Sequence, residues 1–166
     1  QTFTADTAVA VTASVNGNAV SVSSLSAGST VTTKLSAAAS SAATDVTVDY
    51  LAVEDSTTVT LGGGTSGNIT ITDVAALTIT ADDAIDSDSK TLKFDDTDTT
   101  SVTMTLEEVS NSANNALAIE DMSAVTSLSI TASKAAVFGA IGGTSGMEAM
   151  KTMSVAGEKA VTLGAV

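Results

Sequence analysis

The sequence of 166 residues contains no cysteine, no histidine, no arginine and no proline. The absence of cysteine excludes a disulfide framework, a thiolate metal site and a cysteine nucleophile. The absence of histidine excludes Ser-His catalytic triads and nearly all zinc and copper sites. Only six lysines oppose nineteen acidic residues, which gives a net charge of −13. Such a chain lacks the basic surface that binds phosphate, so nucleic acid is not expected as a partner.

Aromatic residues and long apolar runs are also scarce. The aromatic residues are Phe3, Tyr50, Phe94 and Phe138, although hydrophobic residues make up 43% of the chain. Any core must therefore be mainly aliphatic, and the length suffices for one domain or two small ones. No apolar run approaches the roughly 18 residues of a membrane-spanning helix, so no membrane span is expected. The chain starts at Gln1 without a basic leader. This favours a processed chain whose sequence carries no targeting signal of its own.

Internal repeats organise most of the sequence. The string Gly-Gly-Thr-Ser-Gly occurs at 63–67 and again at 142–146. Short apolar-polar-apolar units recur at steps of 26, 25, 26 and 25 residues, namely Leu51-Ala52-Val53, Leu77-Thr78-Ile79, Val102-Thr103-Met104, Leu128-Ser129-Ile130 and Met153-Ser154-Val155. Such even spacing of strand-like units is typical of a repeat protein in which each unit stacks on the next.

Further units of this kind predict two more sides of a coil. The second side would contain 59–61, 136–138 and 161–163, and the third 69–71, 92–94 and 117–119. Alternation of apolar and polar residues buries one face of each strand. We therefore predict an all-β fold in which residues 46–166 form a parallel β-helix, or β-solenoid, with about 25 residues per coil. An antiparallel sandwich, which also contains many short strands, is the alternative.

The first 45 residues show a different pattern. Asn16-Gly17 separates two alternating apolar segments at 9–15 and 19–22, which is typical of a type I′ hairpin. Residues 1–45 are therefore predicted to form a small antiparallel β cap or module that ends in an Ala/Ser-rich linker or short helix at 36–43. Near the other end, the segment 147–153 is expected to make one helical turn before its strand.

Acidic residues gather at one predicted corner of the coil. In the predicted register, Glu54-Asp55, Asp82-Asp83 and Glu107-Glu108 stack on successive coils, followed by Ser133-Lys134 and Glu158-Lys159. Stacked coils lie about 4.8 Å apart, so like charges repel by roughly 1 kcal/mol per pair even in water. A calcium ion, which prefers several oxygen ligands, would relieve this repulsion. The alternative is a solvated acidic edge that keeps the protein soluble.

The candidate calcium ligands share carboxylate chemistry and lie in or near this corner. They are Glu54, Asp55, Asp82, Asp83, Asp86, Asp88, Asp95, Asp96, Asp98, Glu107 and Glu108. No EF-hand loop is present, because the segment 82–88 lacks the glycine and the terminal glutamate of that motif. No catalytic residue is expected: a glycosidase needs two carboxylates across a sugar cleft, and aromatic platforms for a sugar are scarce.

Two segments resemble repeats of a known class of surface protein. The segments 123–137 and 150–163 contain the pattern x-Leu-x-Ser/Thr-Leu-x-Ile/Val-x-Ala/Gly in whole or in part. In this they are similar to the β-helical stretches of calcium-dependent, type I-secreted surface-layer (S-layer) proteins of Gram-negative bacteria, and to repeats of RTX-type adhesins. The resemblance covers roughly residues 74–166. It implies export to the bacterial cell surface, calcium-dependent assembly and a structural role.

The sequence thus predicts a structural, self-assembling extracellular protein, either an S-layer lattice component or a filament subunit, stabilised by calcium and without enzymatic activity. The alternative is an adhesin, a binding module whose solenoid face holds a cell-surface glycan. Self-association is the expected partnership in the first case.

Overall fold

The computed structural model of the chain describes residues 2–5, 10–15, 20–26, 28–35, 45–61, 67–86, 91–94, 98–110, 117–143 and 146–165. In this described part the protein is all-β, without helices. The strands are β1 Thr2–Ala5, β2 Ala10–Val15, β3 Val20–Leu25, β4 Thr30–Leu35, β5 Val46–Leu61, β6 Ile69–Asp86, β7 Thr91–Lys93, β8 Ser101–Ser110, β9 Leu117–Glu120, β10 Ser127–Ala132, β11 Ala136–Ile141, β12 Thr152–Gly157 and β13 Val161–Thr162. The described residues include no helix long and apolar enough to cross a membrane.

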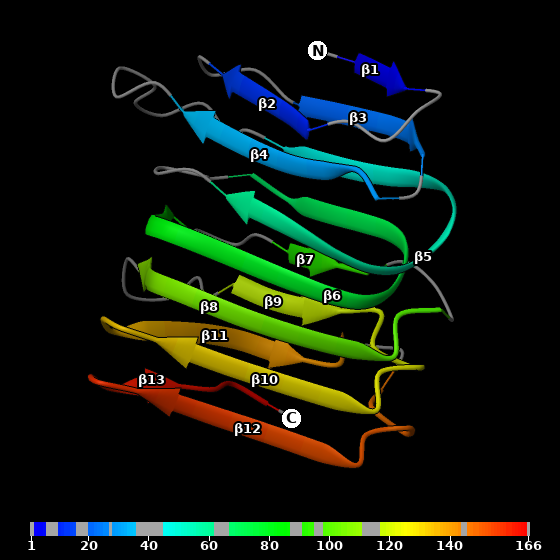
Figure 1. Ribbon diagram of the computed structural model, residues 1–166. Helices are drawn as coiled ribbons and strands as arrows, with labels where there is room; N and C mark the ends of the chain where they lie inside the picture. Colours follow the sequence, from blue (N-terminus) through cyan, green and yellow to red (C-terminus); the bar gives the residue numbers. More distant parts are fainter. Residues whose placement is uncertain are drawn as a thin grey trace.

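The strands form a parallel β-solenoid with two long sides (Figure 1). Side 1 contains β2, β4, the second half of β5, the second half of β6, β8, β10 and β12. Side 2 contains β1, β3, the first halves of β5 and β6, β7, β9, β11 and β13. Because β5 and β6 run around the edge without a break, each contributes to both sides. The coils follow one another at roughly 25 residues.

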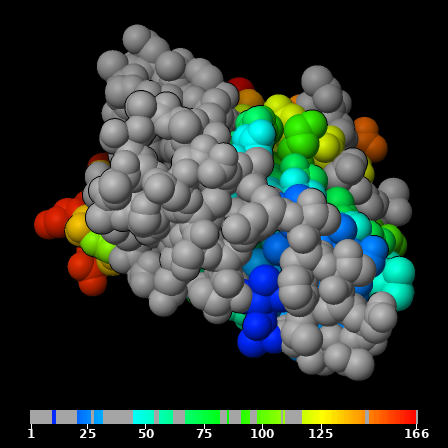
Figure 2. All heavy atoms as spheres, turned by 90° about the horizontal axis from the view of Figure 1, so that it is seen from above, coloured from blue at the N-terminus to red at the C-terminus, as the bar shows by residue number. Residues whose placement is uncertain are grey.

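This architecture confirms the predicted solenoid. Leu77, Val102, Leu128 and Met153 are Cα partners on successive strands of side 1, as the spacing predicts. In the view down the stack from above, atoms of the last coils appear only at the margins of the molecule (Figure 2). The repeat therefore describes a stack along one axis.

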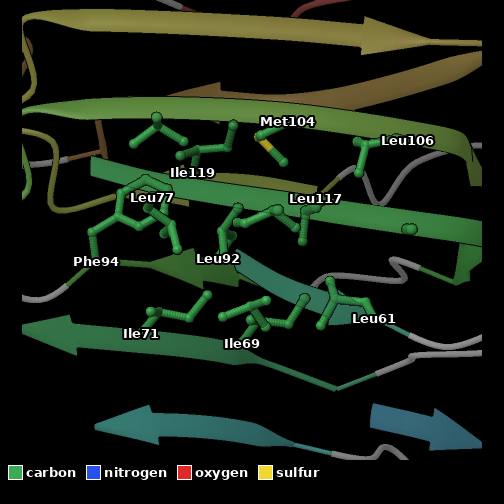
Figure 3. Packing of buried hydrophobic residues seen from close by; sticks show 14 of the residues in the cluster. Leu61, Ile69, Ile71, Leu77, Leu92, Phe94, Met104, Leu106, Leu117 and Ile119 are labelled. Atoms are coloured by element: carbon green, nitrogen blue, oxygen red, sulfur yellow. The ribbon is translucent and has the colours of Figure 1, made fainter. Parts of the chain in front are cut away.

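The interior lies between the two sides and is aliphatic. Leu77 and Met104 on side 1 and Ile69, Ile71 and Ile119 on side 2 point into the same layer (Figure 3). All are at most 2% exposed. Alternation with a period of two residues explains this arrangement, since every second side chain of a strand faces inward. Burial of these rows stabilises each coil only when the next coil covers it.

A residue in the left-handed region turns the chain from side 2 to side 1. Ser24, Asp73 and Asp121 have φ angles of 55°, 60° and 60°. Asp and Ser adopt this region more readily than branched residues do. In each case the residue two positions earlier and the residue directly after it are both buried, namely Val22 and Leu25, Ile71 and Val74, and Ile119 and Met122. The left-handed residue lets both apolar neighbours point inward across the corner.

The predicted position of Leu51-Ala52-Val53 is wrong. Thr57 occupies the place opposite Leu77 on side 1. Asp49 pairs with Thr72 and Glu54 pairs with Val74, so residues 50–53 have only Asp73 opposite them. Tyr50 is buried, but the residues after it bulge out of the bend, which leaves Leu51 71% and Val53 48% exposed. Periodicity in the sequence cannot distinguish such a bulge from a strand of the stack.

The predicted three-sided coil and antiparallel cap are also wrong. Phe138 pairs with Leu117, so the second and third predicted sets of strands share side 2, while 59–61 lies on side 1. The strands β2 and β3 do not pair as a hairpin: β2 pairs with β4 and β3 with β1 and β5, all in parallel. The first strands thus extend the same ladder, because each strand finds its partner one coil away.

The Asn16-Gly17 turn and the segment 36–43 lie outside the described residues. In the segment 147–153, residues 147–150 make a reverse turn in which the Met150 amide donates to the Met147 carbonyl at 3.0 Å, and Thr152 and Met153 already belong to β12.

Candidate functional site

The acidic corner lies where side 1 ends. Ala81, Leu106, Ala132 and Gly157 are Cα partners on four successive strands and mark its start. The next pairing joins Ala84 to Glu108, so Asp82 and Asp83 together oppose the single residue Glu107 along the backbone. The prediction that Asp82-Asp83 and Glu107-Glu108 occupy neighbouring coils at one corner is therefore confirmed.

The next coil brings a cation to this corner. The Lys134 ammonium forms an ion pair with the Glu107 carboxylate, and the Lys134 amide donates to the Glu107 carbonyl at 2.7 Å. The side chain of Lys134 is 56% exposed and that of Glu107 26% exposed, so water screens the pair. The acidic run therefore ends at Glu107, and Lys134 offsets part of its charge.

An open groove of about 590 Å³ runs along this corner and is lined by residues of four successive coils. Thr105, Glu107, Thr131, Ser133 and Glu158 line it with oxygen atoms, beside small residues such as Gly157. Carboxylate and hydroxyl oxygens are ligands that calcium accepts. The chemistry of the groove is thus suited to a hard cation or to hydrogen-bond donors, and it offers no nucleophile activated by a base.

The remaining candidate ligands lie elsewhere. The prediction that Glu54-Asp55 stack on Asp82-Asp83 is wrong, because Glu54 pairs with Val74 at the opposite end of side 1. Asp98 belongs to that same end: the hydroxyl of the adjacent Thr99 donates to the Val74 carbonyl at 2.8 Å. Glu54 and Asp98 therefore lie two coils apart, with Val74 on the coil between them.

Of the other predicted ligands, Asp86 pairs along the backbone with Ser110, beyond the corner. Asp88, Asp95 and Asp96 lie outside the described residues. Within the residues that the structure describes, no three acidic side chains converge as metal ligands. Calcium binding stays a prediction for the corner formed by Asp82, Asp83, Glu107 and Glu108.

Polar side chains that the sequence did not single out hold neighbouring coils together. The Asp45 carboxylate accepts a hydrogen bond from the backbone amide of Asn68 at 2.8 Å. The side-chain oxygen of Asn68 in turn accepts one from the backbone amide of Thr91 at 3.2 Å. Tyr50 donates its hydroxyl to the Ser29 carbonyl at 2.7 Å inside the bend of β5. These contacts follow from the register, so no local sequence signal identifies them.

The last coil leaves its apolar residues partly uncovered. Leu128 and Ile130 of β10 are at most 1% exposed. Their partners one coil later, Met153 and Val155 of β12, are only half-buried, as is Leu163. Among the described strands β12 has β10 as its one neighbour and β13 has β11. The C-terminal end of the stack is therefore an open strand edge backed by half-exposed apolar side chains.

Comparison with known proteins returns no relative: no protein-family model matches the chain, and neither a curated protein nor a solved structure is significantly similar to it. The resemblance to S-layer repeats stays a prediction from the sequence.

Proposed function

We propose that the chain is a structural module of a bacterial cell-surface assembly, an S-layer lattice or a filament, whose solenoids associate end to end. The observation that supports this proposal most strongly is the open C-terminal end, where Met153, Val155 and Leu163 are half-exposed. Open edges carry unpaired backbone groups that readily accept a further strand.

A further coil of the same parallel ladder would cover this end, and the first coil of a second copy can supply it. At the N-terminal end, β1 and β2 each have one neighbour among the described strands, and Val11 of β2 is half-buried. Both ends present one strand of side 1 and one strand of side 2, so a parallel ladder continues from β12 to β2 and from β13 to β1. Such a head-to-tail contact does not close on itself, so it builds filaments rather than dimers.

Calcium completes the proposal at the acidic corner. Asp82 and Asp83 oppose Glu107 on the next strand, and Lys134 offsets part of the charge of Glu107. A bound calcium ion would relieve the repulsion between these coils and stabilise the stack on which the end-to-end contact depends. Export to the cell surface belongs to the same proposal, since calcium is abundant there.

Light scattering after size-exclusion chromatography tests the assembly, at increasing protein concentration and with calcium or EGTA. We expect the wild type to form calcium-dependent oligomers and Val155→Lys to stay monomeric, because a lysine at the open end cannot be buried unpaired. The control is Ser123→Lys, an exposed position within the stack. A wild type that stays monomeric throughout contradicts end-to-end assembly, and glycan binding by that monomer would favour the adhesin alternative.

Thermal unfolding tests the metal separately. Calcium is expected to raise the Tm of the wild type, and the double change Asp82→Asn with Asp83→Asn is expected to abolish this shift. An equal shift in wild type and variant would mean that the ion binds elsewhere.

A further inference from the structure

The outward face of side 1 is a regular array of small hydroxyl side chains, which we call the threonine face. Alternation places the residues between the buried ones on this face. In three rows that run from coil to coil, its residues are Ser56, Ala76, Ser101, Ser127 and Thr152; Thr58, Thr78, Thr103, Ser129 and Ser154; and Thr60, Thr80, Thr105, Thr131 and Ala156. Each is exposed or half-exposed.

The register of the strands makes this array two-dimensional. No register shift interrupts the pairing of residues 56–61 with 76–81, or from there through 101–106 and 127–132 to 152–157. Neighbouring rungs therefore lie about 4.8 Å apart, and neighbouring rows, two residues apart along a strand, lie about 6.6 Å apart. Backbone pairing of Thr60 with Thr32 and of Thr32 with Thr12 extends the third row towards the N-terminal end.

The threonine face is also rigid. Val59, Ile79, Met104 and Ile130, which alternate with its middle and third rows, are at most 1% exposed. Their burial holds the strand backbone in place from below. Threonine is β-branched, which restricts its χ1 angle and holds its hydroxyl and methyl groups in few orientations. The Thr60 and Thr80 hydroxyls share a hydrogen bond of 2.9 Å, so part of the array already joins adjacent rungs.

The threonine face carries no charge, in a chain with nineteen acidic residues and six lysines. Side 2 of the same coils shows what an ordinary outward face holds, since it carries Asp49, Lys93 and Glu120. Solubility alone favours charged residues on a surface. Glu107 and Glu158 border the third row at the next outward positions of side 1. Three adjacent rows without a charge therefore indicate a partner that is uncharged and that a strongly hydrated group would disturb.

We propose that the threonine face binds the surface of ice. The oxygen planes of an ice crystal repeat at spacings close to those of the array, so hydroxyls take lattice positions while methyl groups fit between them. The first water layer on such a face is ordered by the hydroxyls before contact, which lowers the cost of joining the crystal.

A second copy of the face is a poorer occupant. Two threonine faces in contact would bury rows of hydroxyls without bringing a large apolar area out of water. A crystalline polysaccharide would find no aromatic side chain on this face to stack on. These two occupants are outcomes of the test described next.

Thermal hysteresis and inhibition of ice recrystallisation measure the proposed binding directly. We expect the wild-type chain to separate the freezing point from the melting point of a single ice crystal, and Thr103→Lys to lose most of that gap. Thr103 lies in the middle row, with Thr78 and Ser129 as its partners. Ala118→Lys is the matched control, because Ala118 faces outward on β9 of side 2. It should keep the wild-type gap.

Two smaller changes sharpen the assignment. Thr103→Val keeps the shape and the methyl group, whereas Thr103→Ser keeps the hydroxyl; binding by both groups predicts a partial loss for each. Circular dichroism melting confirms that every variant is folded.

A wild type without thermal hysteresis, or a Thr103→Lys variant that keeps it in full, overturns the proposal. If the wild type proves to be a dimer that Thr103→Lys dissociates, or if it binds crystalline polysaccharide instead of ice, the face has that other occupant and the proposal is wrong. The end-to-end assembly is tested at Val155, so either proposal can fail without the other.

Discussion

The two sides of the solenoid share their inward pattern and differ on their outward faces. Inside, Ile79 of side 1 and Ile71 of side 2 are both at most 1% exposed and belong to the same hydrophobic core. Outside, side 1 presents uncharged rows of threonine and serine. Side 2 presents Lys93, whose ammonium lies 3.4 Å from a Glu120 carboxylate oxygen and 3.7 Å from one of Asp121.

This difference separates what the fold requires from what it leaves open. Stacking demands apolar residues inward on both sides, because a coil is stable only when its neighbours cover it. Outward positions make no such demand, and a mixture of charged and polar residues satisfies them. An outward face that departs from this mixture on one side only therefore reflects the surroundings of that side. The two sides should therefore respond alike to changes in the interior and differently to changes on the surface.

The largest effect is expected in the shared interior. Ile79→Ala on side 1 and Ile71→Ala on side 2 should each lower the free energy of unfolding by about 2–5 kcal/mol, through lost burial and a residual cavity. Urea denaturation followed by circular dichroism measures both. Thr78→Ala, the outward neighbour of Ile79, is the control and should cost no more than about 1 kcal/mol. If one isoleucine proves nearly neutral, the two sides do not form a common core.

The inward pattern is also the part of the structure that the sequence predicts best. Regular steps from Leu77 to Met153 predict both the solenoid and the register, because identical coils need identical spacing. The bend of β5 escapes prediction, since the outward bulge at Leu51 keeps the apolar alternation of a strand while leaving the stack. One misplaced coil then misplaces Glu54 in the acidic corner.

The threonine face shows a different limit of the sequence. The pattern Thr-x-Thr is visible at 58–60, 78–80 and 103–105. Its members look like the polar half of ordinary amphipathic strands until the register aligns them. The pattern Thr-x-Thr is frequent in strands. It becomes an array only because the register aligns Thr60, Thr80, Thr105 and Thr131 on four successive strands.

The next largest effect is expected at the corner that joins the two sides. Asp73 has a φ of 60°, a conformation that a β-branched side chain adopts only with strain. Asp73→Val should therefore cost about 1–3 kcal/mol of unfolding free energy. Asp73→Asn, which tolerates the same conformation, is the matched control and should remain close to the wild type. Equal losses in both variants would assign the effect to the carboxylate rather than to the backbone.

A smaller effect is expected from the buried hydroxyl of Tyr50, in the bend between the sides. It donates to the Ser29 carbonyl at 2.7 Å and lies 2.5 Å from the Thr57 hydroxyl. Tyr50→Phe should lower the free energy of unfolding by about 1 kcal/mol, because Thr57 still donates to the same carbonyl at 3.1 Å. Combining it with Thr57→Val removes both donors and should cost more than the two single changes together. An additive result in chemical denaturation would show that the two hydroxyls do not substitute for one another.

The smallest effect is expected on the outward face of side 2. Lys93→Met removes two ion pairs whose side chains are exposed, with 43% of Lys93 and 36% of Glu120 open to water. Such pairs contribute about 0–1 kcal/mol, and salt screens them, so the difference from wild type should vanish in concentrated sodium chloride. Ice binding should be unchanged in this variant, since Lys93 faces away from the threonine face. A Lys93→Met variant that loses thermal hysteresis while keeping its Tm would mean that both sides touch the crystal. The absence of charge from the threonine face would then need another cause.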